Sequence, residues 1–174
     1  MLHVTCLSPH AHTPTYLLTC SHTLQRTVLD PIHPMAVLDA LGSQPLDLIL
    51  LTNASALVVE AAEVLHHRTS AAILASNTLN TRKLPIARYL TDGEVVGLGP
   101  LAQTVYVPEG DLMCYALGSE GLLFTGPLFA EGLASHKANK LGMAKLGILP
   151  TDTTVHGGGT NGGQPLGPLL EKLK

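Results

Sequence analysis

Short apolar runs separated by turn-forming residues fill the first half of the chain and predict strands. Residues 16–20 and 26–30 predict two strands around a polar turn. Residues 46–51 are almost wholly apolar, which is typical of a buried strand, and residues 71–75 repeat that pattern. We therefore predict four strands within the first 75 residues.

Helical spacing of apolar residues occurs between these strands. Residues 56–67 predict the clearest helix, because apolar positions recur every three or four residues and the charged positions share the opposite face. Residues 35–41 predict a shorter helix that ends at Gly42. Residues 46–75 therefore form a strand–helix–strand unit, which is the building block of parallel strand pairing.

From Gly93 onward the chain changes to short strands separated by glycine, proline and acidic residues. Because the glycine-rich stretch 157–163 lacks the Lys-Ser/Thr ending of a phosphate loop, we expect a flexible loop rather than a backbone cradle for an anion. The alternation of helices and strands predicts an α/β fold in a single domain spanning residues 1–174. The elements predicted here are strands at 94–98, 103–107, 112–117 and 121–125, a polar helix at 133–145, a strand at 153–156 and an apolar tail helix.

Composition narrows the function classes. Hydrophobic residues make up 45% of the chain and charged residues 13%, which excludes intrinsic disorder. So little charge also predicts that a protein partner or a second copy covers part of the apolar surface, so we expect a homo-oligomer or a protein complex. The net charge of −3 and the 3% aromatic content give no basis for nucleic-acid binding.

Signals for membranes and secretion are missing from the sequence. No apolar run approaches the roughly 18 residues that a membrane-spanning helix needs. The first residues contain no basic segment followed by a long apolar stretch, so we expect no secretory signal. Three cysteines at unrelated spacings are typical of reduced thiols, and we therefore expect a cytoplasmic protein without disulfides.

Several short segments in consistent order carry a family resemblance. They are Tyr-Leu-Leu at 16–18 with Val-Leu-Asp-Pro at 28–31, Leu-Ile-Leu-Leu-Thr at 48–52, Asp-Gly-Glu at 92–94 with Leu-Gly at 98–99, Cys-Tyr-Ala-Leu at 114–117 with Leu-Leu-Phe-Thr-Gly at 122–126, and Leu-Pro-Thr-Asp-Thr-Thr-Val at 149–155. Together the segments resemble the metallo-β-lactamase fold superfamily in its small, glyoxalase II-like form. The resemblance implies an αββα sandwich of two mixed β-sheets flanked by helices.

The resemblance also implies where a metal site would lie. Members of the superfamily bind one or two metal ions, usually zinc, between the sheets, and a metal-bound hydroxide attacks the substrate. Their first motif is Thr-His-x-His-x-Asp-His, and residues 52–58 stand in its place. The four donor positions hold Asn53, Ser55, Leu57 and Val58, of which the last two cannot coordinate a metal. We expect the two aliphatic residues to pack on the helix, and Asn53 or Ser55 to cap its N–H groups.

The later ligand positions are changed as well. Where the superfamily has Pro-Gly-His, this chain has Pro-Glu-Gly-Asp at 108–111. Pro127 stands at the position of the bridging aspartate. The final Gly-His-Gly corresponds to three glycines at 157–159, immediately after His156. We therefore expect the metal centre to be absent, and we assign no cofactor.

Two alternatives keep a chemical role for the site. One is a relocated metal site that uses His10, His12 and His156, because the first two are alternate residues and face the same side of an extended segment. The other is a metal-free pocket for a small organic substrate, and its lining residues would be Asn53, Ser55, Glu109, Asp111 and His156, with Glu109 and Asp111 as an acid/base pair. A hydrolase, lyase or isomerase is then the activity expected.

The sequence as a whole favours a protein that is not an enzyme. A scaffold of this kind without its metal donors is expected to act as a binding, structural or regulatory subunit. We expect no bound nucleic acid and no membrane, whereas a small-molecule ligand of unidentified chemistry stays open.

Overall fold

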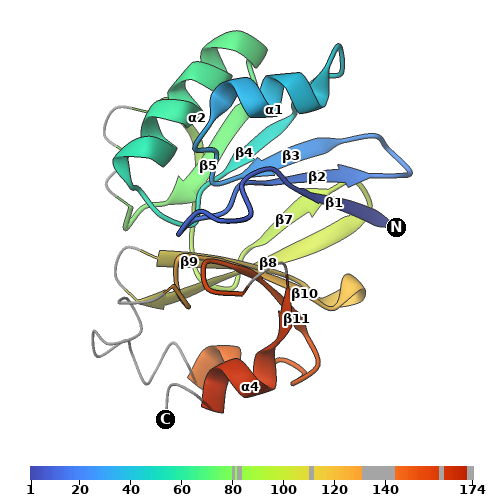
Figure 1. Cartoon of the computed structure of the whole chain (residues 1–174), viewed down its shortest axis with the longest axis vertical. Helices are drawn as coiled ribbons and strands as arrows, with labels where there is room; N and C mark the ends of the chain where they lie inside the picture. Colours follow the sequence, from blue (N-terminus) through green and yellow to red (C-terminus); the bar gives the residue numbers. More distant parts are fainter. Residues whose placement is uncertain (80, 82–83, 110–111, 131–143, 161–162, 172–174) are drawn as a thin grey trace.

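A computed structural model describes residues 1–79, 81, 84–109, 112–130, 144–160 and 163–171, with the backbone alone described at Ala102 and at residues 104–109. Two six-stranded sheets face one another, with helices on both outer sides (Figure 1). Helices α1 (Pro34–Leu41) and α2 (Ala56–Thr69) cover the first sheet, and α4 (Leu166–Glu171) covers the second. The predicted αββα sandwich is confirmed.

The first sheet is mixed. Strands β1, β2 and β3 pair antiparallel, and β3, β4, β5 and β6 pair parallel. The strand–helix–strand unit predicted over residues 46–75 is present as β4, α2 and β5. The strands of this sheet, in spatial order, are β1 (Leu2–Cys6), β2 (Tyr16–Cys20), β3 (Arg26–Leu29), β4 (Leu48–Leu50), β5 (Ala72–Ser76) and β6 (Ile86–Leu90).

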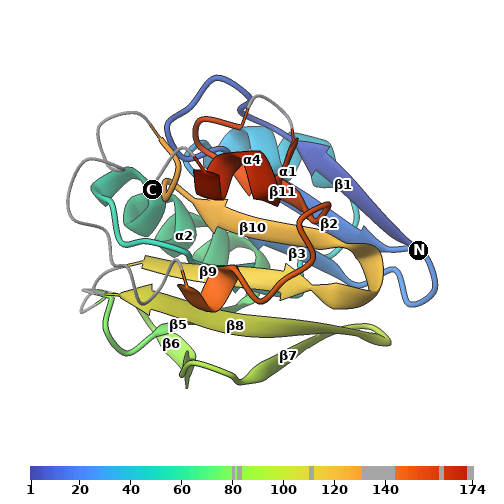
Figure 2. The ribbon, with the colours of Figure 1, turned by 90° about the horizontal axis from the view of Figure 1, so that it is seen from below.

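The second sheet is also mixed, because β10 and β11 pair parallel while its other neighbours pair antiparallel. A 3-10 turn at Gly118–Glu120 joins β9 to β10, and Figure 2 shows β7 to β10 side by side. Its strands, in spatial order, are β12 (Gln164–Pro165), β11 (Thr154–Gly157), β10 (Leu122–Gly126), β9 (Leu112–Leu117), β8 (Leu101–Glu109) and β7 (Val95–Leu98).

Three edge strands of the sheets differ from the sequence prediction. Strands β1, β6 and β12 were not predicted. Strand β6 exposes three consecutive side chains and shows no alternation. Its pairing with β5 alone makes it a strand. Of the helix predicted over 133–145, only residues 144 and 145 lie in the described part, where residues 144–146 are helical.

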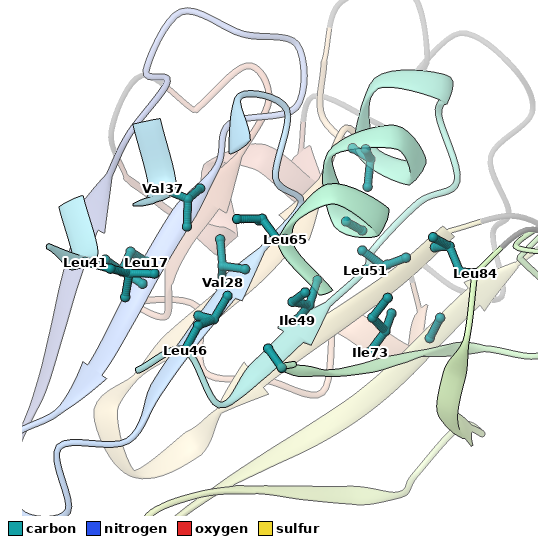
Figure 3. Packing of buried hydrophobic residues seen from close by; sticks show 14 of the residues in the cluster. Leu17, Val28, Val37, Leu41, Leu46, Ile49, Leu51, Leu65, Ile73 and Leu84 are labelled. Carbon is teal, nitrogen blue, oxygen red and sulfur yellow. The ribbon is translucent and has the colours of Figure 1, made fainter. Parts of the chain in front are cut away.

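Three apolar clusters hold the four layers together. The first lies between α1, α2 and the first sheet, and Val37, Leu65, Ile49 and Ile73 are among its members (Figure 3). The second fills the space between the sheets, and the third lies beneath α4. Among the described residues, no helix is long and apolar enough to cross a membrane.

Candidate functional site

The positions that resemble the metal motifs converge at one end of the two sheets. Thr52 follows β4, Gly126 ends β10 and Gly158 follows β11. The N–H of Gly158 donates to the carbonyl of Gly126 over 2.7 Å, and the N–H of Met113 donates to the carbonyl of Thr52 over 2.7 Å. A Cβ on Gly126 would lie 1.9 Å from Thr52 Oγ1, so the backbone at the end of β10 closely approaches the side chain of Thr52.

Asn53 and Ser55 are placed at the start of α2, where the first two donors of the motif would stand. Asn53 is buried, and its Oδ1 accepts the N–H of Ser55 over 3.0 Å. This bond forms a local turn ahead of the helix, as expected for an Asn in this position. Ser55 is exposed and its side chain makes no capping bond, so only Asn53 performs part of the capping role that the sequence predicted.

The two aliphatic residues at the next donor positions have different surroundings. Val58 is fully buried in the cluster between α2 and the first sheet. Leu57, by contrast, is 60% exposed, so the prediction that it packs on the helix is wrong. The reason is the helical period: the inward face of α2 is formed by positions 58, 61, 62 and 65, which turns the preceding residue toward solvent.

A buried carboxyl group lies next to this motif. Asp30 is 1% exposed and adopts a φ of 45° at the end of β3. Its Oδ1 accepts the N–H of Thr52 over 2.8 Å, its Oδ2 accepts the hydroxyl of Thr52, and the N–H of Asn53 also donates to it. Burial raises the pKa of Asp30 from 3.8 to about 7, because these neutral donors offset only part of the cost of desolvating the charge.

Within the described part of the glycine-rich stretch 157–163, the glycines at 157–159 are closely packed, which corrects the expectation of a flexible loop there. A Cβ on Gly158 would lie 1.9 Å from the carbonyl oxygen of His12 and 3.0 Å from Cβ of Ala130. A Cβ on Gly159, whose φ is 80°, would lie 2.3 Å from the carbonyl oxygen of Phe129. The backbone of His12 therefore occupies the space into which a side chain at position 158 would project, and the backbone of Phe129 does the same at position 159.

His156 lies in an aromatic cluster. Its ring stacks on Phe124 at 5.2 Å between centroids and meets Tyr16 edge-on at 5.4 Å. Burial lowers the pKa of His156, and its Nδ1 is buried without a hydrogen-bond partner. Burial also raises the pKa of Tyr16, whose hydroxyl interacts with Thr160 and Cys6. These three side chains therefore form an uncharged aromatic cluster between the sheets.

The other predicted site residues are not brought together as a donor set. His10 and His12 are both exposed, in the segment between β1 and β2. Asp111 lies outside the described residues, as does the side chain of Glu109. Throughout the described ranges, no group of three or more His, Cys, Asp or Glu side chains is arranged to hold a metal ion.

A separate cavity lies away from this region. It has a volume of about 260 Å³ and lies beside the turn between β9 and β10, at the end of those strands opposite Gly126. Glu120 and Asp152 contribute carboxylates to its lining, and Leu149 and Pro150 contribute apolar surface.

Sequence reasoning missed the pair formed by Asp30 and Thr52. Both residues belong to segments that carry the resemblance, but neither stands at a metal-donor position. The only local signal is an acidic residue that directly ends an apolar strand. A hydrogen bond between residues 22 positions apart has no signature in the sequence.

Comparison with solved structures identifies the fold. The chain has the metallo-β-lactamase fold, shared with the BLEG-1 B3 metallo-β-lactamase at 18% identity and a TM-score of 0.74, over 98% of this chain and 97% of that one. TTHA1623 in a di-iron-bound form is similar at 19% identity and a TM-score of 0.71, over 98% of this chain and 96% of that one. ETHE1 from Myxococcus xanthus is similar at 20% identity and a TM-score of 0.71, over 95% of this chain and 80% of that one. No protein-family model and no curated protein matches the sequence.

The residues present do not fit a metal ion of the kind that the resemblance implies. The first motif supplies an amide, a hydroxyl and two aliphatic side chains in place of imidazoles and a carboxylate. Pro127, which is buried, offers no donor at all. At Gly158 the carbonyl of His12 leaves no room for an imidazole. No catalytic step through a metal is therefore derived for this chain.

Proposed function

We propose that this chain is a metallo-β-lactamase-fold protein that works without a metal centre, as a non-catalytic binding, structural or regulatory subunit. The observation that carries the proposal is the contact between Gly158 and the carbonyl of His12. It places backbone where the last histidine ligand would project. The burial of Val58 in the core beneath α2 supports the same conclusion from the other sheet.

Metal analysis of the purified full chain tests the proposal. We expect less than one equivalent of zinc, iron and manganese after expression in medium supplemented with each metal. We also expect a chelator to leave the melting temperature unchanged, because a metal that binds only the folded state would raise it. A stoichiometric metal whose removal lowers the melting temperature would contradict the proposal.

A reconstituted variant sharpens this test. Asn53→His, Ser55→His, Leu57→Asp and Val58→His together restore the four donors of the first motif. We expect this variant still to bind no stoichiometric metal, since Pro127 and Gly158 remain unchanged and the protein loses a buried core residue. If the variant folds and binds one metal ion per chain, then Pro127 and Gly158 do not prevent metal binding.

The proposal includes a protein partner or a second copy of the chain, and a cytoplasmic location. Low charge supports the first, together with exposed apolar side chains such as Ile148 at 75% and Leu57 at 60% exposure. Free thiols at Cys6, Cys20 and Cys114 support the second. Light scattering of the purified protein is expected to give a mass above 18.3 kDa, and a monomer at all concentrations would exclude self-association.

A further inference from the structure

The cavity beside the turn between β9 and β10 lies apart from the positions of the metal motifs. It has a volume of about 260 Å³, and its lining runs from the buried Ala116 and Leu117 to the exposed Gly118 and Asp152, so it opens to solvent. Sites for drug-sized ligands occupy roughly 300–1,000 Å³. The cavity therefore suits a smaller molecule that enters directly from solvent.

Backbone hydrogen bonds hold the walls of this cavity in place. The N–H of Thr154 donates to the carbonyl of Gly121 over 2.8 Å, which joins the start of β11 to the residue before β10. The N–H of Thr153 donates to the carbonyl of Pro150 over 3.0 Å, and the N–H of Leu166, at the start of α4, donates to the carbonyl of Thr153 over 2.9 Å. Because these segments are already ordered, a ligand binds here without the cost of ordering them.

The ionisable side chains of the lining are acidic. Glu120 is half-buried in the turn between β9 and β10, and Asp152 lies in the segment before β11. In the described part of the chain, neither carboxylate has a hydrogen-bond or ion-pair partner, and no Lys, Arg or His lines the cavity. Carboxylates without a neighbouring positive charge favour a cation and repel an anion.

Thr153 adds a neutral hydrogen-bonding group to the same lining. This residue is 5% exposed, and its hydroxyl makes no hydrogen bond to a described residue. The hydroxyl is not sealed in the core, as those of Thr27 and Thr125 are, so it opens toward the cavity that the residue lines. An alkylammonium group carries several N–H donors, and the carboxylates of Glu120 and Asp152 together with this hydroxyl supply acceptors for them.

Apolar side chains form much of the remaining wall. Leu117, Leu122 and Leu149 line the cavity together with Pro150. A calcium ion takes about six to eight oxygen ligands and gains nothing from such a surface. A short alkyl chain, by contrast, is stabilised when it leaves water for an apolar wall. The combination of carboxylates and apolar wall therefore favours an organic cation over a metal ion.

We propose that this cavity binds a small primary amine, with its ammonium group at Glu120, Asp152 and Thr153 and its short apolar chain against the leucine side chains. The amine supplies a ligand for the binding role proposed above. The site uses none of the residues on which the loss of the metal centre is argued. Metal analysis and amine binding can therefore fail separately.

A titration of the full chain with n-butylammonium, followed in NMR spectra of the backbone amides, tests the proposal. We expect saturable shifts at the amides that line the cavity, above all Gly118, Gly121 and Thr154. The alcohol n-butanol has the same chain without the charge, and we expect it to bind at least about tenfold more weakly. Absence of a saturable shift with n-butylammonium, or equal binding of the two compounds, would overturn the proposal. This comparison uses the wild-type chain and does not depend on the folding of a variant.

A charge-removing variant tests the assigned carboxylates. Glu120→Gln together with Asp152→Asn keeps the shape of both side chains, and we expect it to weaken n-butylammonium binding at least about tenfold. Asp39→Asn, on the exposed side of α1, is the matched control and should keep the wild-type affinity. An unchanged affinity in the double variant, or an equal loss in the control, would overturn the assignment.

The same titration separates two other occupants. Calcium chloride that produces the same shifts at a lower concentration than n-butylammonium would reveal a metal site and overturn the proposal. A lysine side chain from another protein carries the same ammonium group. Tighter binding of Nα-acetyl-lysine methylamide than of n-butylammonium would overturn the assignment to a free amine.

Discussion

Replacing Asp30 with asparagine is expected to remove a pH dependence of stability that this carboxyl group creates. Asparagine keeps the shape of the side chain, and its amide suits both bonds to Thr52: the oxygen accepts the N–H, and the NH2 group donates to the hydroxyl. The variant therefore removes the charge and retains the packing. Asp39→Asn, on the exposed side of α1, is the matched control.

The magnitude follows from the pKa of Asp30, which rises from 3.8 to about 7 on folding. Between these two values the folded protein holds a proton that the unfolded chain has released, so the free energy of unfolding falls as pH rises. A rise of about three pKa units corresponds to roughly 4 kcal/mol, fully lost above pH 7 and fully retained below pH 4. Asp30→Asn is thus expected to match wild type near pH 4 and to exceed its stability by up to about 4 kcal/mol at pH 8.

Urea unfolding followed by circular dichroism from pH 4 to pH 8 measures this difference. The informative quantity is the slope of unfolding free energy against pH in wild type minus that in Asp30→Asn. Asp39→Asn should keep the wild-type slope. Parallel curves for wild type and Asp30→Asn, or a variant less stable than wild type at pH 8, would show that Asp30 is charged and well solvated in the folded protein.

Further substitutions check the contacts that close the site, all by urea unfolding. Gly158→Ala is expected to lower the free energy of unfolding by at least about 2 kcal/mol, because its Cβ would lie 1.9 Å from a backbone oxygen. Gly118→Ala would place its Cβ in open space and should change the free energy of unfolding little. Equal effects at these two glycines would refute the close packing. Val58→Ala should lower the free energy of unfolding by about 2 kcal/mol, because it leaves a cavity in the core, whereas Leu57→Ala should lower it by less than about 0.5 kcal/mol. If Leu57→Ala were the more destabilising variant, α2 would bury a different face. Tyr115→Phe removes a buried hydrogen bond of 3.1 Å from the Tyr115 hydroxyl to the carbonyl of Leu51. It should lower the free energy of unfolding by about 1 kcal/mol. An unchanged free energy of unfolding would mean that this hydrogen bond between the sheets is absent.

The sequence by itself predicted the helices and strands whose buried faces give a regular pattern of apolar residues. Residues 46–51 are apolar except for Asp47, because β4 is covered on one face by α2 and on the other by the second sheet, and the sequence shows this pattern directly. The helix over 56–67 was found for the same reason, since burial of one face imposes a period of 3.6 residues. The order of several short segments, through their family resemblance, then predicted the αββα sandwich. The same resemblance showed from the sequence alone that residues 53, 55, 57 and 58 replace the metal donors of the first motif.

Contacts between distant segments were decided only by the tertiary structure. Strand β6 has no alternation because it lies at a sheet edge, and pairing with β5 alone makes it extended. Gly158 is required by the carbonyl of His12, which lies 146 positions earlier in the chain. The high pKa of Asp30 comes from burial by other segments. Periodicity indicates which face of a helix or strand is buried. Close backbone contacts and the desolvation of a charged group depend on atoms from segments distant in the sequence, so no local pattern predicts them.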